Sequence, residues 1–314
     1  MAQAPDFAPR REEPLFGRLA IVGIGLIGSS IAHAARQLNL AGRIVLADRD
    51  EAVCARAREL GLGHEVAETA REAVAGADLV ILCVPVGACG PVAAEIAPAL
   101  KPGAILSDVG SVKSSVVEAV LPHLPEGVHF VPAHPVAGTE NSGPDAGFAS
   151  LFLNRWCILT PPEGADEAAV ARTRHFWEGM GAIVETMSAQ HHDLVLGITS
   201  HLPHLIAYTI VGTADELAAV TQSEVIKFSA GGFRDFTRIA ASDPTMWRDV
   251  FLHNKEAVLE MLGRFSEDLA VLTRAIRYGD GDTLHQHFTR TRAIRRGIVA
   301  LGQDKPETEK LRKE

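Results

Sequence analysis

The sequence has little of several features that mark common classes of protein. Basic residues are outnumbered, with 30 Lys and Arg against 39 Asp and Glu, so the net charge is −9. Binding to a nucleic-acid backbone requires clustered positive charge, and nucleic acid is therefore not expected as a partner. The chain also has no uninterrupted apolar run of 18 residues and no charged-then-apolar leader. These absences argue against a membrane span and against secretion.

Cysteine is scarce as well. The four cysteines, Cys54, Cys83, Cys89 and Cys157, show no spacing typical of metal ligands. Reduced thiols in the core of a cytoplasmic protein are the expected role. With 314 residues, 47% of them hydrophobic, the chain is long enough for two domains with well-buried cores.

The most informative stretch begins with an apolar segment, Leu19 to Val22, that runs directly into a glycine-rich turn. Gly23 allows the tight turn, Gly25 lets the backbone approach a pyrophosphate, and Gly28 lets the following helix pack close to the strand. The positive end of that helix then favours an anion. The predicted cofactor contacts of this turn are Gly23, Gly25, Leu26, Ile27 and Gly28.

A second apolar segment ends at Asp48, about twenty residues after Gly28, where a carboxylate accepts hydrogen bonds from both ribose hydroxyls. A carboxylate repels a 2′-phosphate, which favours NAD. The adjacent Arg49 attracts one, so NADP stays open. The alternative interpretation is an ordinary strand–turn–helix in which Asp48 caps the next helix.

Apolar segments alternate with helical patterns after Asp48. The expected strands are His64–Ala67, Asp78–Val84, Ala104–Ser107, Val128–Ala133, Trp156–Thr160 and Ala182–Glu185. This alternation predicts an α/β protein with a Rossmann-type, doubly wound and mostly parallel sheet. Loops after its strands, at Val84 and Pro85, at 108–113 and at 134–140, should border the cofactor.

Strand-like patterns stop near Met187. We expect a flexible leader at 1–17, a dinucleotide-binding domain at 18–187 and an all-helical domain at 188–314 that binds substrate and forms a homodimer. The expected helices of that domain are Ser188–Val211, Leu217–Ala230, Pro244–Tyr278 and Asp282–Leu301, followed by a charged tail from Gln303.

His134 is the best candidate for a group that handles protons near a nicotinamide. Pro135 forces it into an extended conformation, and its ordinary pKa suits proton acceptance from an alcohol near neutrality. The alternative is a loop histidine that is bonded to backbone. Ser111 follows a buried strand and is placed to bond a substrate hydroxyl or to cap a helix, while Lys113 can lend positive charge. Glu140 either pairs with a cation across the cleft or is a solvated loop charge.

In the helical domain, Pro203 within a helix leaves the carbonyl of Thr199 without its partner, which favours a functional interpretation. His201 and His204 lie on neighbouring parts of one helix face. A zinc site is the rival idea, but the spacing differs from His-Glu-x-x-His and no third ligand is evident, so no metal is predicted. Arg234, Asp235 and Arg238 form a charged segment in which one arginine can grip a carboxylate and the other can pair with Asp235.

Together these motifs resemble the prephenate/arogenate (cyclohexadienyl) dehydrogenase family of tyrosine biosynthesis. The resemblance covers about Arg18 to Leu262 and is carried by Gly23-x-Gly25-Leu-Ile-Gly28, Asp108-Val-Gly-Ser-Val-Lys113, His134-Pro-Val-Ala-Gly-Thr-Glu140, Ser200-His-Leu-Pro-His204, Asp235-Phe-Thr-Arg-Ile-Ala240 and Met246-Trp247. Where the family usually has a second glycine after Gly28, this chain has Ser29.

The resemblance implies NAD-dependent oxidative decarboxylation of prephenate, arogenate or both, with His134 as the base at the ring 4-hydroxyl and Ser111 assisting it. It implies that His204 and Arg238 hold the substrate and that Glu140 and Asp235 influence access to the site. His201 is included among the expected substrate contacts. The rivals are a β-hydroxyacid-type NAD(P) dehydrogenase and a non-catalytic dinucleotide sensor. The first would place a lysine on the helix Ser188–Val211, which contains none.

Overall fold

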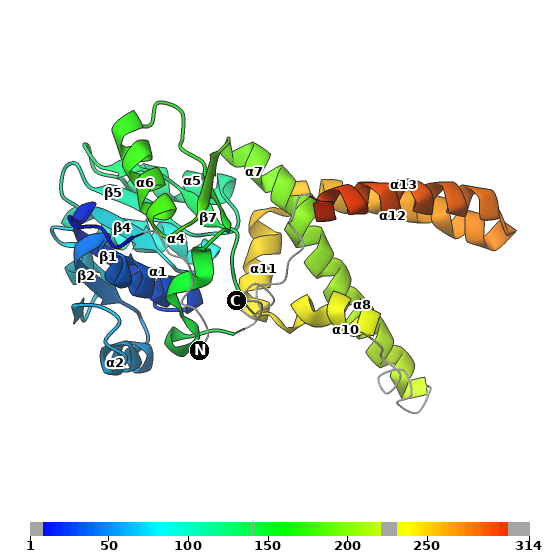
Figure 1. Ribbon diagram of the computed structural model, residues 1–314, viewed down its shortest axis with the longest axis horizontal. Helices are drawn as coiled ribbons and strands as arrows, with labels where there is room; N and C mark the ends of the chain where they lie inside the picture. Colours follow the sequence, from blue (N-terminus) through cyan, green and yellow to red (C-terminus); the bar gives the residue numbers. More distant parts are fainter. Residues whose placement is uncertain (1–8, 140, 221–230, 301–314) are drawn as a thin grey trace. The chain divides into compact units, whose positions relative to one another are not determined.

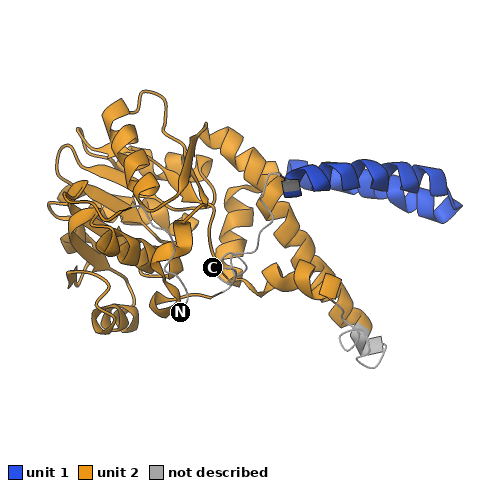
Figure 2. Cartoon of the chain, viewed as in Figure 1, with its two compact units in different colours: residues 1–6, 259–314 blue, residues 7–258 orange. Residues whose placement is uncertain are grey.

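The computed structural model describes residues 9–139, 141–220 and 231–300. They divide into two compact units, residues 7–258 and residues from Leu259 onward (Figure 2). The strands are β1 Phe16–Val22, β2 Ala41–Ala47, β3 Glu65–Val66, β4 Leu79–Leu82, β5 Ile105–Asp108, β6 His129–Phe130, β7 Ala133–Pro135, β8 Trp156–Leu159 and β9 Ile183–Thr186.

Helices connect the strands and make up the rest of the described chain (Figure 1). The α-helices are α1 Leu26–Gln37, α2 Glu51–Glu59, α3 Ala70–Val74, α4 Cys89–Ile96, α5 Ser114–Val120, α6 Glu167–Gly179, α7 Ala189–Leu196, α8 Leu202–Val220, α10 Gly231–Thr237, α11 Pro244–His253, α12 Lys255–Tyr278 and α13 Gly281–Ala300. The short 3-10 turns are η1 Val86–Ala88, η2 Ala97–Ala99, η3 Leu121–His123, η4 Pro144–Ala146, η5 Ala149–Phe152 and η7 Arg238–Ala241, and η6 Gly197–His201 is a π-helix.

Six strands form a parallel sheet in the order β3-β2-β1-β4-β5-β6. This order confirms the predicted doubly wound fold, whose ligand crevice lies at the carboxyl ends of the strands, where the order reverses between β1 and β4. Alternate residues of β1 enter different cores, Leu19 and Ile21 on one face and Ala20 and Val22 on the other. Both faces are therefore covered, as the apolar runs predicted.

One predicted strand, Val128–Ala133, is two strands in two different sheets. β6 pairs in parallel with β5, whereas β7 pairs antiparallel with β8 in a separate three-stranded sheet, β7-β8-β9. Pro132 lies between β6 and β7, and a residue without an N–H cannot extend the ladder. β8 and β9, predicted as two further strands, therefore lie outside the six-stranded parallel sheet.

Residues before β1 are more ordered than the predicted leader of 1–17 implies. β1 begins at Phe16, and the Arg11 N–H donates to the Leu38 carbonyl. The Asn39 side chain donates to the Arg11 carbonyl, so this segment is hydrogen-bonded to the residues just after α1. Residues 1–8 and the predicted charged tail from Gln303 lie outside the described residues.

The helical half departs from prediction at three points. α8 continues through the expected break before Leu217, and the remainder of the expected helix Leu217–Ala230, residues 221–230, lies outside the described residues. The expected helix Pro244–Tyr278 breaks at Asn254, whose side chain is buried and bonded to other helices. The expected helix Ser188–Val211 contains the π-helical stretch η6 immediately before Pro203.

The π-helix supplies the compensation that Pro203 was expected to require. Leu202 N–H donates to the Gly197 carbonyl, five residues back, and the side chain of His204 bonds the Ser200 carbonyl at 2.8 Å. Such bulges are frequent at functional sites. Beyond Asn254, α12 and α13 form a helical hairpin, with the turn at Gly279 to Gly281 closed by a hydrogen bond from Asp280 N–H to the Ala275 carbonyl.

Candidate functional site

The glycine-rich turn has the geometry that a dinucleotide requires. Gly23 has φ of +99°, and a Cβ there would stand 2.3 Å from the Cys83 carbonyl oxygen. At Gly28 a Cβ would stand 2.1 Å from the Gly23 carbonyl oxygen, so strand and helix touch here. Gly25 differs: no described atom lies within 4 Å of its Cβ position. It is the N-cap of α1 and brings no side-chain cap. That leaves space and N–H groups for an anion.

The other predicted cofactor residues lie along the same edge of the sheet. Leu26 and Ile27 form the first turn of α1, Asp48 and Arg49 follow β2, and Val84 and Pro85 follow β4. Asp48 is half-buried, and its carboxylate accepts the Ile24 N–H at 2.8 Å, which fixes it beside the glycine turn. These residues fit a bound dinucleotide.

Ser29, the departure from the family pattern, is accommodated within the helix. Its hydroxyl donates to the Gly25 carbonyl at 2.6 Å, and the side chain is fully buried. Gly147 packs directly on it, because a Cβ at 147 would stand 2.2 Å from the Ser29 Oγ. The hydroxyl is thus bonded within the first turn of α1.

His134 lies on β7 at the carboxyl end of the parallel sheet and is 8% exposed. Its Nδ1 stands 2.8 Å from His192 Nε2 on α7, and the two rings meet edge to face with centroids 5.0 Å apart. Burial lowers the pKa of His134 well below its ordinary value, and the nearby His192 and Lys113 lower it further. The imidazole is therefore neutral near pH 7, as a proton acceptor must be.

Lys113 fixes the strand that carries His134. Its ammonium is fully buried and donates to Asp108 Oδ2 at the end of β5 and to the Ala133 carbonyl at 2.7 Å. Lys113 was considered as a source of positive charge for the substrate. The structure instead uses the charge to join β5 to β7, so that His134 is held against the carboxyl edge of the sheet.

Ser111 is half-buried in the loop between β5 and α5, but it does not cap α5. That helix begins at Ser114 with Lys113 as its N-cap, two residues later than a Ser111 cap would give, and its N–H groups are capped by a side chain distant in sequence. Asp193 on α7 accepts the Lys113 N–H at 2.7 Å and the Ser114 N–H at 2.8 Å. The hydroxyl of Ser111 is thus not committed to capping.

His204 and Arg238 come together, as predicted for a substrate clamp. His204 stacks on Trp247 of α11, with ring centroids 3.6 Å apart and planes inclined by 24°. Burial lowers the pKa of His204, and the charge of Arg238 lowers it further. The segment that carries Arg238 is held by Tyr208, which donates to the Ser242 carbonyl at 2.8 Å.

The neighbouring arginine has a different partner. Arg234 bonds Asp235 at 3.1 Å on the surface, in the internal pairing considered for this segment. Arg238 is exposed and lies near enough to His204 for its charge to act on that ring. Arg234 therefore takes the internal-pair role, and the role of Arg238 in gripping a carboxylate stays a prediction.

His201 meets the same Trp247 ring edge to face, with ring centroids 6.0 Å apart, but it lies on the buried side of that ring. His201 is fully buried, with Nδ1 3.0 Å from Asn254 Nδ2, so it has no exposed surface for a ligand. Burial lowers its pKa to about 4. Glu140 lies outside the described residues. Within the described ranges, no three His, Cys, Asp or Glu side chains gather in an arrangement suited to a metal ion.

Sequence reasoning missed the residues behind His134. His192, Asp193 and Asn254 are not among the predicted site residues. One signal was present: Asp193 is the only Asp, Glu, Lys or Arg between Ala189 and Ala214. A single charge in an apolar helix requires a buried partner or a function.

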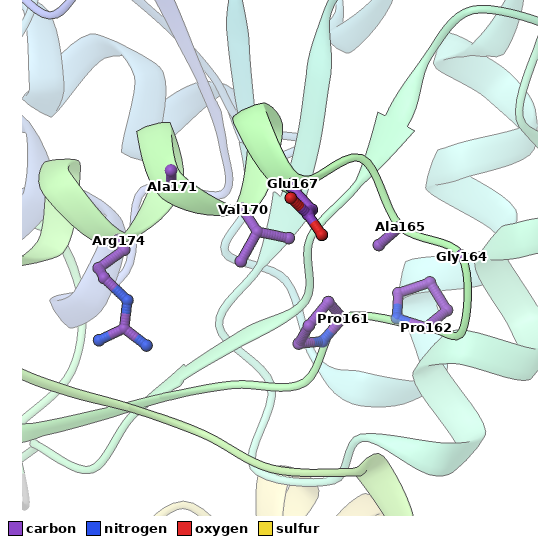
Figure 3. A pocket seen from close by; sticks show the side chains of 8 residues that line it. All are labelled: Pro161, Pro162, Gly164, Ala165, Glu167, Val170, Ala171 and Arg174. Atoms are coloured by element: carbon purple, nitrogen blue, oxygen red, sulfur yellow. The ribbon is translucent and has the colours of Figure 1, made fainter.

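A surface hollow of about 380 Å³ lies elsewhere, between the β8–α6 loop and the first turns of α6 (Figure 3). Its lining is mostly apolar, with Pro161, Pro162 and Val170, and Arg174 at its edge bonds the Val184 carbonyl. None of the predicted site residues lines it.

All four cysteines are free thiols, and Cys54, Cys89 and Cys157 are buried, as expected for reduced core residues. One helical stretch, Ala189–Leu217, has the length and the mean hydropathy, 1.5, of a membrane span, although the sequence has no unbroken apolar run there. Its polar residues His192, Asp193 and His201 are buried against the nucleotide-binding half.

Comparison with known families gives two adjoining matches. The nucleotide-binding domain of prephenate dehydrogenase matches residues 31–186, and the dimerization domain of prephenate dehydrogenase matches residues 188–290.

Individual proteins are similar over most of the chain. A cyclohexadienyl dehydrogenase from Zymomonas mobilis is 47% identical over 281 residues, which cover 90% of this chain and 96% of that protein. A prephenate dehydrogenase from Bacillus subtilis is 33% identical and covers 89% of this chain and 76% of its own length. The crystal structure of prephenate dehydrogenase from A. aeolicus in complex with hydroxyphenyl propionate and NAD+ superposes with a TM-score of 0.84 at 33% identity, covering 90% of this chain and 98% of that one.

Proposed function

The chain belongs to the prephenate dehydrogenase family, and we propose that it catalyses the NAD-dependent oxidative decarboxylation of prephenate, of arogenate or of both. The products are 4-hydroxyphenylpyruvate and tyrosine, respectively. The observation that supports this most is the buried, neutral His134 at the carboxyl edge of a dinucleotide-binding sheet. Family membership displaces the β-hydroxyacid dehydrogenase and the non-catalytic sensor as alternatives.

The cofactor is held by the glycine turn and by Asp48. The N–H groups at the start of α1 bind the pyrophosphate, and the Asp48 carboxylate accepts hydrogen bonds from the ribose. Bound NAD supplies the acceptor for the hydride that leaves ring C4. Val84 and Pro85, after β4, border the same crevice. Residues 18–187 thus serve the cofactor, and residues 188–314 serve the substrate and the dimer.

His134 handles the proton. As hydride leaves C4, His134 Nε2 removes the proton of the 4-hydroxyl and the carbon–oxygen bond becomes a carbonyl. The ring carboxylate then leaves as CO₂, and its bonding electron pair passes into the ring and makes it aromatic. His134 returns the proton to the phenolate that results. Such proton transfer contributes roughly 10²–10⁴ to the rate, and Ser111 assists by bonding the same hydroxyl.

Substrate is held by the neutral imidazole of His204 and the positive charge of Arg238. A guanidinium suits a carboxylate because it donates two parallel hydrogen bonds. The stack of His204 on Trp247 fixes the imidazole ring. Glu140, six residues after His134 in the sequence, influences access to the site.

Two variants test this assignment. His134→Ala should leave NAD affinity nearly intact while turnover of prephenate and arogenate falls by orders of magnitude. Arg238→Gln should raise KM far more than His134→Ala does. NAD affinity is measured by fluorescence titration, and turnover is followed as NADH absorbance with each substrate and with NAD or NADP. Wild-type turnover in the His134 variant, or an unchanged KM in the Arg238 variant, would refute the respective role.

The proposed assembly is a homodimer through the helical domain, in the cytoplasm, where the free thiols stay reduced. Large apolar side chains are exposed on α8, α12 and α13, among them Ile210, Leu269, Ile276, Phe288 and Ile294. Light scattering should give twice the mass of one chain, and the mass of a single chain would contradict the dimer.

A further inference from the structure

His134 and two side chains behind it form a single hydrogen-bonded row. His134 Nδ1 stands 2.8 Å from His192 Nε2, and His192 Nδ1 stands 2.8 Å from Asp193 Oδ1. All three are buried, and His192 is fully so. The row runs from β7 to two consecutive residues of α7. It therefore joins the strand that carries the proposed base to the first helix of the helical domain.

The position of each proton along the row follows from the ionisation state of Asp193, which is at the end opposite His134. Burial alone would raise the pKa of Asp193, but hydrogen bonds from His192 and Ser114 outweigh burial, and the pKa is lowered. The carboxylate is therefore ionised and can only accept. The shared proton then belongs to His192 Nδ1 and, because burial lowers the pKa of His192 and keeps it neutral, its Nε2 carries a lone pair.

A lone pair on His192 Nε2 determines the tautomer of His134. The 2.8 Å contact is a hydrogen bond only if His134 Nδ1 carries the proton. The other ring nitrogen of His134, Nε2, then has the lone pair. That is the form which can accept a proton from a substrate hydroxyl.

We propose that His192 and Asp193 are a positioning dyad that fixes the ring and the tautomer of His134, so that its Nε2 is the basic nitrogen. The inference rests on the proposed function, in which that nitrogen removes the ring hydroxyl proton. His192 and Asp193 touch neither substrate nor cofactor. They act through His134, as a carboxylate orients the histidine of a hydrolase triad.

The dyad is itself held in place. The Asp193 carboxylate accepts the N–H groups of Lys113 and Ser114, and its backbone carbonyl accepts from Asn254 Nδ2 at 2.9 Å. The titratable groups that face His134 are His192, Lys113 and His201, and those that face His192 also include Asp193 and Asp108. Lys113 is bonded to Asp108, which leaves Asp193 as the carboxylate in direct contact with His192.

The first test compares three full-length variants. His192→Leu removes the acceptor for His134 Nδ1–H, and kcat should fall roughly 10²-fold or more, while KM and NAD affinity change less than about threefold. His192→Gln, whose amide oxygen can accept the same hydrogen bond, should keep kcat within about tenfold of wild type. His191→Leu is the matched control, because His191 is the exposed neighbour, and kcat should be unchanged. A His192→Leu enzyme with kcat within twofold of wild type would overturn the proposal.

The second test does not depend on turnover or on the folding of a variant. In wild-type protein labelled with ¹⁵N-histidine, the His134 resonances, assigned by their loss in His134→Asn, should show a protonated Nδ1 and an unprotonated Nε2. The opposite tautomer would overturn the dyad even if the enzyme is active. Conversely, a wild-type protein that oxidises neither prephenate nor arogenate refutes the proposed function, while the ¹⁵N result still decides the dyad.

Discussion

The buried Lys113 should contribute more to stability than any surface ion pair in the described chain. Lys113→Met removes the partner of a fully buried Asp108 carboxylate, whose Oδ1 already has no hydrogen bond and whose Oδ2 keeps only the Gly110 N–H. An uncompensated buried charge costs about 3–5 kcal/mol, and the Ala133 carbonyl loses its hydrogen bond as well. Since a whole domain is stable by only about 5–15 kcal/mol, much of the folding free energy should disappear.

Urea unfolding followed by tryptophan fluorescence measures this loss. Lys101→Met is the matched control: its ammonium also bonds a carboxylate, Asp78 at 2.5 Å, but the side chain is 40% exposed. Such a pair contributes roughly 0–1 kcal/mol. Lys113→Met combined with Asp108→Asn should recover at least about 2 kcal/mol of the loss, because no charge then remains buried. The reasoning is refuted if Lys113→Met costs no more than Lys101→Met.

Three further outcomes are expected. Gly28→Ala should lower both the unfolding free energy and the affinity for NAD, because its Cβ would stand 2.1 Å from a carbonyl oxygen. Gly25→Ala, with open space at its Cβ, should fold normally and raise the Kd for NAD at least about tenfold. If denaturation and NAD titration show equal effects for the two variants, this reasoning is contradicted. Acid should destabilise the protein, because burial holds the pKa of His201 at about 4, below the ordinary 6.5. The contribution of neutral His201 to the unfolding free energy is fully present above pH 6.5 and is lost as the pH falls. From His201 alone the loss between pH 7.5 and pH 5 should be about 2 kcal/mol. The buried His134 and His192 act in the same direction, and urea midpoints that are equal at the two pH values would exclude the effect. Tyr208→Phe should raise KM while kcat stays within twofold of wild type, and it should lower the unfolding free energy by about 1 kcal/mol. The reason is that the Ser242 carbonyl loses its donor, so the segment that carries Arg238 is held less firmly. An unchanged KM in steady-state assays would show that this hydrogen bond is dispensable.

The nucleotide-binding half could be predicted because its signals are local. Each glycine of the first turn meets a steric requirement that the sequence states directly, and buried parallel strands appear as unbroken apolar runs. The order of the six strands follows from the alternation of strand and helix with right-handed connections. Among the strands, the split of the segment Val128–Ala133 was missed, although Pro132 within it was a sign that the ladder could not continue.

The features that escaped prediction depend on side chains distant in sequence. The helix after β5 begins at Ser114 because Asp193, 79 residues later, accepts its N–H. The helix expected over Pro244–Tyr278 breaks at Asn254, whose amide bonds Asp193 and His201 instead of solvent. Helical periodicity reports which face is apolar, but it does not report which polar groups meet across two helices.

His134 itself was predicted from local sequence, because Pro135 and the preceding strand limit where it can lie. What prepares that histidine could not be predicted in the same way. His192 and His191 are chemically identical neighbours, and only the docking of α7 on the sheet makes one buried and the other exposed. The sequence pattern therefore predicts the proposed base but not the residues that lie behind it.

The single carboxylate of Asp193 makes fold integrity and chemical competence inseparable in this molecule. If α7 shifted by one helical turn, about 5.4 Å, α5 would lose its cap. The imidazole of His134 on β7 would lose its hydrogen bond to His192 in the same event. A misassembled or partly opened chain would consequently be inert, with no stage at which it could oxidise an unprotected substrate. Asp193→Asn should accordingly lower the thermal stability and the reaction rate together.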